Sequence, residues 1–354
     1  MKRRKKRLKN RKLLYISLSV LFVLAIYLGL RGFAYYTSMQ KPNIFVHPDK
    51  KEFLLIYKND GFDDVVKKLE KSGTVKNIKS FIHAAEKLNY PDNIVLGRYE
   101  LVDGMSNREL LRKLINGRQT PTRITFNNIR TKEALAQKLS SQLHLDSAAM
   151  INVLNDREIL SEYRLTPATV VSLFIPNTYE VYWDISPENL LKRMKKEYDT
   201  FWTEDRLMKL NDVGLDRVEV TTLASIVEEE TKKRDEKPVV AGLYLNRINK
   251  RMPLQADPTV KFALQDFSLK RIYYEHLTIN SPYNTYKYAG LPPGPIRIPS
   301  IESIDAVLNY QAHNYIYMCA KEDFSGYHNF ATTLEEHNRN AAKYRRESNR
   351  RGIR

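Results

Sequence analysis

The feature that most constrains this chain is an uncharged apolar run close to its start. Residues 13–30 read LLYISLSVLFVLAIYLGL, without one Asp, Glu, Lys or Arg. A helix of this length reaches the roughly 18–20 apolar residues needed to cross the hydrocarbon core of a bilayer. Phe33, Tyr35 and Tyr36 follow the run and supply aromatic side chains for the membrane–water interface. We therefore predict a single transmembrane helix at residues 13–36.

Basic residues before this run predict its orientation. Residues 1–12 (MKRRKKRLKNRK) contain nine Lys or Arg and no acidic residue, within a net charge of +17 for the whole chain. Positive charge before a span predicts that the N-terminus stays in the cytoplasm. We expect a basic cytoplasmic tail at 1–12, a single-pass anchor in the cell (inner) membrane, and the rest of the chain on the periplasmic or extracytoplasmic side.

Two alternatives compete with this interpretation. A cleaved signal peptide would have an apolar core of roughly 7–15 residues, which is shorter than the run at 13–30. The basic tail and the basic segment 339–354 could instead bind nucleic acid, and such binding would depend steeply on salt. Without the tail, however, the net charge falls to +8 on 342 residues, so we expect a membrane partner and no nucleic acid.

The polar, Pro-containing segment 37–52 is predicted to be a tether, and a small α+β unit follows it. Its expected order is strand, helix, helix, strand, at residues 53–57, 65–69, 81–88 and 97–101. Ser106 and Glu109 then form a capping box that starts a further helix. The β-α-α-β order resembles a LysM-like glycan-binding module, so we assign residues 53–120 to a LysM-like subdomain.

Residues 121–354 are predicted to form a second α+β domain. Apolar positions of the first unit recur there at an offset of seventy residues, for example Leu54 with Ile124, although chance explains this as well as duplication does. Helices are predicted at 187–202 and 217–234. From residue 280 onward, Gly- and Pro-rich loops flank a predicted strand at 315–318, which favours a cleft built from loops.

Several kinds of chemistry are excluded by the motifs that the sequence lacks. There is no Gly-rich phosphate-binding motif and no nucleophile elbow. The single cysteine, Cys319, excludes a disulfide framework and a Cys-based zinc site. No two of the seven histidines have metal-binding helical spacing. We therefore expect no metal and no cofactor, and the chemistry that remains is that of carboxyl groups.

The strongest carboxyl candidate is the predicted helix TTLASIVEEET at residues 221–231. Helical geometry places Glu230 within the apolar stripe, directs Glu229 to solvent, and sets Glu228 on the flank above the small residues Ala224 and Ser225. A partly desolvated carboxyl group has a raised pKa and suits a general acid. The alternative is an ordinary acidic helix surface.

Six ordered motifs carry a resemblance to a known family. They are A-S-I-V-E-E-E at 224–230, L-Q-A-D-P-T at 254–259, S-P-Y-N-T-Y at 281–286, G-L-P-P-G-P-I at 290–296, G-Y-H-N-F at 326–330 and E-H-N at 336–338. In this order they resemble the YceG-like family, the MltG-type endolytic murein transglycosylases. More loosely, the similarity extends from about residue 50 to the C-terminus.

This resemblance implies roles for particular residues. Glu228, the first glutamate of the motif, would be the catalytic residue, while Glu230 would support the structure, modulate Glu228 or help to bind substrate. Four loop side chains are candidates for holding the sugar rings: Gln255, Asp257, Asn284 and Tyr286. The chain departs from the family at Asn177, where an aspartate is usual, so this position supplies no second carboxylate.

The implied activity is that of a lyase that cuts the MurNAc–GlcNAc bond with one carboxyl group. Protonated Glu228 would donate to the leaving oxygen, and the C6 hydroxyl of MurNAc would attack, leaving a 1,6-anhydro end. Cutting nascent peptidoglycan strands would limit their length, with peptidoglycan synthases as candidate partners. The alternative function is a non-catalytic, membrane-anchored peptidoglycan-binding scaffold.

Overall fold

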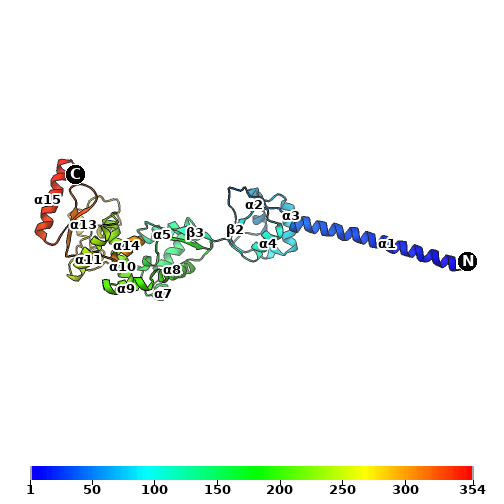
Figure 1. Ribbon diagram of the computed structural model, residues 1–354, viewed down its shortest axis with the longest axis horizontal. Helices are drawn as coiled ribbons and strands as arrows, with labels where there is room; N and C mark the ends of the chain where they lie inside the picture. Colours follow the sequence, from blue (N-terminus) through cyan, green and yellow to red (C-terminus); the bar gives the residue numbers. More distant parts are fainter. Residues whose placement is uncertain (1, 353–354) are drawn as a thin grey trace. The chain divides into compact units, whose positions relative to one another are not determined.

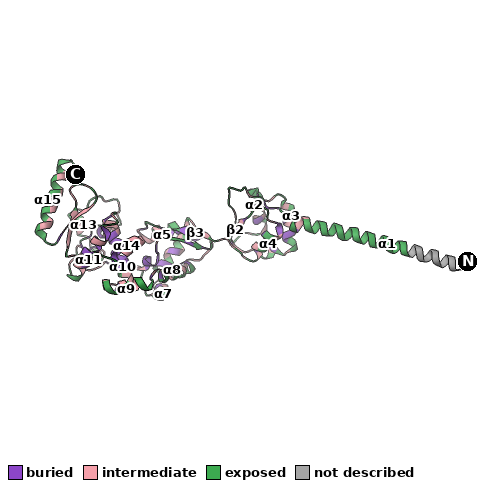
Figure 2. Ribbon diagram, in the orientation of Figure 1, coloured by how far each residue is buried: buried purple, intermediate pink, exposed green. Residues whose placement is uncertain are grey.

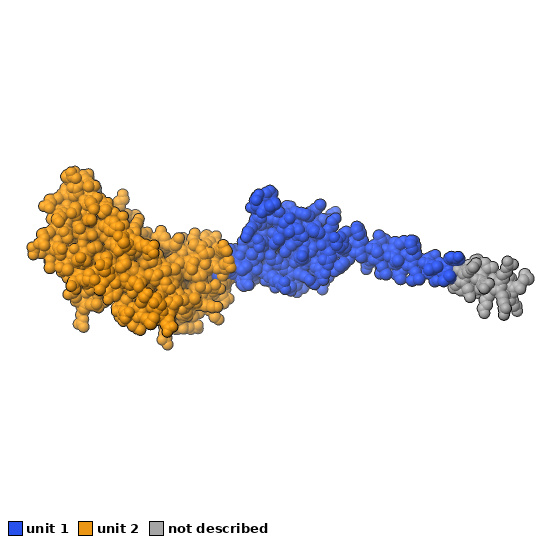
Figure 3. Space-filling model, in the orientation of Figure 1, with its two compact units in different colours: residues 1–122, 181–184 blue, residues 123–180, 185–354 orange. Residues whose placement is uncertain are grey.

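The structure is a computed structural model that describes the backbone of residues 2–352 and the side chains of residues 14–352. The chain divides into two compact units (Figure 3). The first comprises residues 1–122 and 181–184, and the second comprises residues 123–180 and 185–354. Helices and short two-stranded sheets occur in both, as expected for the α+β class. The return of 181–184 to the first unit was not predicted.

Helix α1 (Lys2–Tyr35) covers the predicted span and continues into a short π-helix at Tyr36–Gln40. The stretch Leu14–Gln40 has a mean hydropathy of 2.0 in its most apolar window, and none of that window is buried. Figure 2 shows the described part of α1 as exposed along its length. Its length and composition fit a single-pass membrane anchor. The basic side chains of the predicted tail, 1–12, lie outside the described residues.

The first unit follows the predicted order of strand, two helices and strand, and then adds a third helix (Figure 1). The elements are β1 (Glu52–Ile56), α2 (Phe62–Ser72), α3 (Ile78–Lys87), a 3-10 turn at Tyr90–Asp92, β2 (Gly97–Leu101) and α4 (Asn107–Ile115). Strands β1 and β2 pair antiparallel. Helix α4 begins with the predicted capping box, in which Ser106 and Glu109 each accept the other's backbone N–H.

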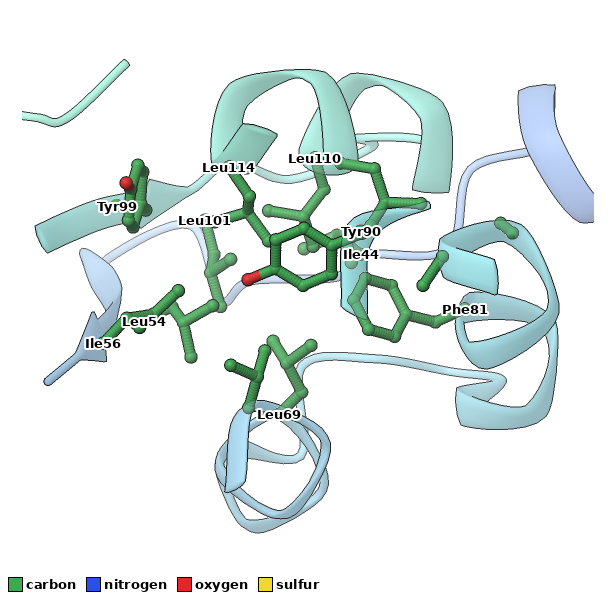
Figure 4. Close-up of a cluster of buried hydrophobic side chains, with 14 of the residues drawn as sticks. Ile44, Leu54, Ile56, Leu69, Phe81, Tyr90, Tyr99, Leu101, Leu110 and Leu114 are labelled. Carbon is green, nitrogen blue, oxygen red and sulfur yellow. The ribbon is translucent and has the colours of Figure 1, made fainter. Parts of the chain in front are cut away.

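One cluster of buried apolar side chains holds the first unit together (Figure 4). Alternation along β1 sends Leu54 and Ile56 to the same face of the sheet. There they meet Leu69 of α2, Phe81 of α3 and Leu110 of α4. Apolar residues whose spacing predicted these separate elements therefore pack together in one shared core.

The segment 37–52 is not the free tether that its polar composition suggested. Met39 and Ile44 are buried in the core of the first unit. Asn43 is buried as well, and its Nδ2 donates to Asn107 Oδ1 at 2.7 Å. The backbone N–H groups of Asn43 and Ile44 also donate to the carbonyl of Met105, at 2.9 and 3.0 Å. Composition alone does not reveal such anchoring points. The longest exposed run of the segment is residues 47–51.

The second unit is mainly helical, with two further pairs of short strands. Its elements are β3 (Thr122–Thr125), α5 (Lys132–Ser140), α6 (Ser147–Asn155), α7 (Arg157–Ser161), a 3-10 turn at Val170–Leu173, β4 (Thr178–Val181), α8 (Pro187–Phe201), α9 (Glu204–Val213), α10 (Arg217–Glu230), α11 (Lys237–Asn249), α12 (Asp257–Leu264), α13 (Tyr274–Leu277), α14 (Ile301–Leu308), β5 (Tyr317–Ala320), β6 (His328–Ala331) and α15 (Leu334–Arg350). Strand β3 pairs with β4, and β5 pairs antiparallel with β6.

Helix α10 is the central helix of the second unit. All eight residues of its segment 220–227 are buried, and the helix packs against α11, α12 and α14. It ends at Glu230, four residues before the predicted end. The reason is Thr231, whose backbone is extended and whose Oγ1 accepts the N–H of Lys233 at 3.1 Å, a local turn that competes with the helix. The three glutamates therefore occupy the last helical positions.

Candidate active site

The three consecutive glutamates at the end of α10 meet three different environments. Successive residues of a helix point about 100° apart, so adjacent side chains reach different neighbours. Glu228 lies toward α14, Glu229 toward two arginines, and Glu230 toward α11. Their surroundings therefore decide what each carboxyl group can do.

Glu228 is held by hydroxyl groups and a lysine. Its Oε2 accepts the hydroxyls of Ser300, at 2.5 Å, and of Ser303, both at the start of α14. Lys237 Nζ lies 3.4 Å from the same oxygen. Burial acts to raise the pKa of Glu228, but the two hydroxyls and Lys237 outweigh it and hold the pKa below its ordinary value. These contacts favour the ionised form of Glu228, whereas the predicted role as a catalytic acid needs the protonated form.

Glu229 does not face solvent as the helical pattern suggested. Arg130 donates to both of its carboxylate oxygens at 3.0 Å, and Arg297 Nη1 lies 2.5 Å from Oε1. The Glu229 side chain is only 18% exposed. Burial acts to raise its pKa, but the two guanidinium groups hold the pKa below the ordinary range. Glu229 is thus part of a half-buried ion-pair network, which the prediction of a surface charge missed because Arg130 lies far away in sequence.

Glu230 lines a polar cavity that neither Glu228 nor Glu229 reaches. Tyr244 on α11 donates its hydroxyl to Glu230 Oε1 at 2.8 Å. Burial raises the pKa of Glu230 to about 7, and the nearby charge of Asp257 adds to this rise, while His328 and Lys261 oppose it. At neutral pH the group is therefore divided between its protonated and ionised forms, which is the state required of a general acid.

The cavity beside Glu230 has a volume of about 270 Å³ and is mostly polar. Its wall comes from α10, α11, the loop before α12, the start of α12, the loop before α14, β5 and β6. The lining residues are Glu230, Leu243, Tyr244, Arg247, Leu254, Gln255, Asp257, Tyr286, Met318, Cys319, Ala320 and His328. Of the site residues predicted from sequence, the structure brings Glu230, Gln255, Asp257 and Tyr286 together here. Glu228 and Asn284 are not part of the wall.

Asn284 has a structural role in the loop instead. It is fully buried, its Nδ2 donates to the carbonyls of Leu277 (2.8 Å) and Ile279 (2.9 Å), and its Oδ1 accepts the backbone N–H of Tyr286 at 3.1 Å. These bonds use both N–H donors of the amide and one acceptor position of its oxygen, so Asn284 shapes the loop that carries Tyr286. The prediction that Asn284 binds sugar is therefore not supported by its position.

Gln255, Asp257 and Tyr286 form one polar wall of the cavity. The hydroxyl of Tyr286 donates to Asp257 Oδ1 at 2.6 Å. Gln255 adopts a left-handed backbone (φ 52°), and its side-chain oxygen accepts from Arg247 Nη1 at 3.3 Å. Both Gln255 and Asp257 remain exposed. They can therefore offer hydrogen-bonding groups to a ligand that enters the cavity.

Sequence reasoning did not assign Tyr244, Arg247 and His328 to the site. Arg247 is buried and is held by the carbonyls of Leu254 (2.8 Å) and Ile316 (2.6 Å). His328 lies in the G-Y-H-N-F motif, so a signal for it was present. The signal for Tyr244 and Arg247 was weaker: the two residues are three positions apart, so they lie on the same face of a helix. Among the described residues, no group of three or more His, Cys, Asp or Glu side chains is arranged to hold a metal ion.

Comparisons with known proteins agree with the motifs. The model of the YceG-like family matches residues 54–343. The endolytic murein transglycosylase of Bacillus subtilis is 31% identical over 296 residues, covering 78% of this chain and 80% of that protein. The endolytic murein transglycosylase of Streptococcus pneumoniae is 28% identical over 311 residues, and the match spans 55% of its length. A crystal structure of a yceG-like protein from Listeria monocytogenes covers 82% of this chain, with 98% of its own chain matched, at 28% identity and a TM-score of 0.54.

Proposed function

This chain belongs to the YceG-like family, and we propose that it is an endolytic murein transglycosylase, a lyase that cuts the glycan strands of peptidoglycan. Two relatives that match 78% of the chain bear that name. The single observation that carries the proposal is the cavity beside Glu230, where burial raises the pKa of a carboxyl group to about 7. A proton donor in a polar cavity is what cleavage of a glycosidic bond requires.

We propose Glu230 as the catalytic acid in place of Glu228. A general acid must hold its proton at the working pH and must reach the substrate. Glu228 is ionised, and its Oε2 is engaged by two serines and a lysine. Glu230 has the suitable pKa and lines the cavity. The proposed catalytic acid therefore lies in the same motif of three glutamates, two residues further along the helix than the sequence predicted.

In the proposed reaction, one bond to C1 of MurNAc breaks and another forms, and no water takes part. Glu230 donates its proton to the glycosidic oxygen as the bond from that oxygen to C1 of MurNAc breaks. The C6 hydroxyl of the same MurNAc attacks C1 and loses its proton, which closes a 1,6-anhydro ring. Asp257, Gln255 and Tyr286 would hold the sugar hydroxyls and the N-acetyl group. Hydrolysis would instead need a second carboxylate to activate water or to act as nucleophile.

The apolar helix α1 supports a cellular setting for this reaction. We propose that α1 anchors the protein in the cell membrane with its N-terminus in the cytoplasm, because basic residues precede the span. Both folded units would then face the cell wall. There the enzyme would cut nascent strands, limit their length and work beside peptidoglycan synthases. A LysM-like role for residues 53–120, in binding glycan, belongs to the same proposal.

The test is product analysis with full-length protein in detergent. Wild-type protein should release fragments with 1,6-anhydro-MurNAc ends from purified peptidoglycan, as measured by mass spectrometry. Glu230→Gln keeps the shape but removes the proton, so turnover should fall by roughly 10²–10⁴-fold.

Glu228→Gln is the matched control, since it changes a neighbouring glutamate outside the cavity and should lose far less turnover. Loss of activity in Glu228→Gln with retention in Glu230→Gln would return the acid role to Glu228. No cleavage by the wild type would favour the non-catalytic scaffold.

A further inference from the structure

The wall of the cavity beside Glu230 includes a histidine, His328, which is paired with a buried carboxylate. His328 Nδ1 lies 2.9 Å from Glu236 Oε2, and the backbone N–H of His328 donates to Glu236 Oε1 at 2.6 Å. Glu236 is only 4% exposed and stands just before α11. Both of its oxygens are thus engaged by one residue at the start of β6.

This partner fixes the tautomer of the histidine. A carboxylate accepts hydrogen bonds, so the Nδ1 facing Glu236 carries a proton, and in the neutral ring Nε2 is the basic nitrogen. The side chain of His328 is 16% exposed and forms part of the cavity wall. A histidine oriented in this way by a carboxylate is arranged to accept a proton from a bound hydroxyl group.

The charges around the ring favour proton uptake by His328. Burial acts to lower the pKa of His328, but the hydrogen bond and charge of Glu236, with a contribution from Glu230, raise the pKa above its ordinary value. The titratable and charged groups on the elements around the ring are Glu230, Glu236, Tyr244, Arg247, Asp257, Tyr286 and Cys319, with Asp235 and Lys233 beside the neighbouring Tyr327. The carboxyl groups of Glu236 and Glu230 therefore favour the protonated form of His328.

We propose that His328 is the general base of the reaction, so that acid and base belong to two residues rather than to one carboxyl group. This inference rests on the proposed function of the Glu230 cavity. As the bond between O6 and C1 of MurNAc forms, the hydroxyl proton passes to His328 Nε2. As the bond between C1 and the glycosidic oxygen breaks, that oxygen keeps the electron pair and takes the proton of Glu230.

The two transfers leave an ionised Glu230 and a protonated His328. Passage of one proton from His328 to Glu230, directly or through water in the cavity, restores both groups. No water is consumed, and the products together have the composition of the substrate. Glu236 acts as a positioning residue, because it touches the ring of His328 and holds the tautomer.

The experiment uses full-length protein in detergent with purified peptidoglycan and counts 1,6-anhydro ends against time. His328→Ala should lower kcat by about 10²–10⁴-fold with little change in KM. Added imidazole should restore part of this activity, more so at a pH where imidazole is neutral. Glu230→Gln should not be rescued by imidazole, since it lacks the acid and retains its base.

Two further variants separate a base from a merely structural histidine. Glu236→Gln removes the charge that raises the pKa of His328, so the acidic limb of the pH–rate profile should move to lower pH. His47→Ala changes an exposed histidine of the first unit, with a side chain 67% exposed, and should leave the rate unchanged. Thermal unfolding of each variant shows whether it is folded.

Several results would overturn the inference while leaving the proposed function intact. They are full activity of His328→Ala, a folded but inactive His328→Ala that imidazole does not rescue, and an unchanged acidic limb in Glu236→Gln. Absence of 1,6-anhydro ends from the wild type would overturn both proposals together.

Discussion

At the scale of residues, one side-chain type takes three roles within one helical turn. Glu228 and Glu229 are ionised because hydroxyl groups, Lys237 and two arginines stabilise their negative charge. Glu230 has mainly a tyrosine hydroxyl, so burial prevails and its pKa rises to about 7. At Glu228 and Glu229, hydrogen-bonding and charged partners offset the free-energy cost of removing a carboxylate from water. At Glu230 this cost instead favours the protonated form of the carboxyl group.

The raised pKa of Glu230 predicts how activity depends on pH. The proposed catalytic form is the protonated one, which is lost as the pH rises through the folded-state pKa of about 7. Turnover should therefore decline on the alkaline side of about pH 7 and approach a tenfold loss per pH unit. Initial rates of 1,6-anhydro-end formation from pH 5 to 9 check this. A rate that stayed constant to pH 9 would contradict the role of Glu230.

The ion-pair network of Glu229 predicts an effect on stability. Glu229→Gln leaves Arg297, which is 9% exposed, and Arg130 without their anion. We expect the free energy of unfolding to fall by about 2–3 kcal/mol, as is usual when one partner of a largely buried ion pair is removed. Denaturant unfolding measures it. Glu162→Gln, at an exposed glutamate of the same unit, is the control and should change stability by less than about 0.5 kcal/mol.

At the scale of elements, helix ends and short anchored segments determine where functional groups lie. Helix α10 stops at Glu230 because Thr231 forms a local turn, and this leaves Glu230 at the end of the helix beside the cavity. In the first unit, the segment that follows α1 is held by Met39 and Ile44 in the core. Helix α1 is therefore joined to a packed segment and not to a free tether.

That packing predicts the effect of shortening one buried side chain. Ile44→Ala removes apolar contacts from a position with no exposed surface, so the first unit should lose about 2–5 kcal/mol of unfolding free energy. Its neighbour Phe45 is 46% exposed, and Phe45→Ala should cost less than about 1 kcal/mol. Denaturant unfolding of both variants makes the comparison. Equal, small effects would show that the segment is a tether after all.

At the scale of the whole molecule, the proposed arrangement is an anchor helix followed directly by a folded unit. Because residues 36–40 pack against α3 and α4, the chain has no long flexible segment between α1 and the first unit. Anchoring would thus keep the protein close to the membrane, where new strands emerge. The proposed catalytic residues all belong to the second unit.

Orientation is checked with a reporter fused after Arg354. Nine basic residues before the span predict that the fusion is active only outside the cytoplasm. A reporter that is active in the cytoplasm would remove access to peptidoglycan and with it the proposed function.

The role of the anchor is checked by deleting residues 1–36 and exporting the remainder. Every cavity residue is retained, so activity on isolated peptidoglycan should persist. In cells, average glycan strands should lengthen, because the enzyme is no longer concentrated at the membrane. Unchanged strand lengths at matched abundance would show that anchoring does not select the substrate.

The sequence by itself determined the features that depend on neighbouring residues. Apolar length defined the span, spacing defined the strand-helix-helix-strand order and the capping box at Ser106, and the ordered motifs identified the family. The tertiary structure decided which glutamate reaches the cavity. Helical periodicity gives the direction of each side chain around its own axis, but not what lies in that direction. The deciding partners, Ser300 and Arg130, are 72 and 99 residues away along the chain, and only folding brings them beside α10.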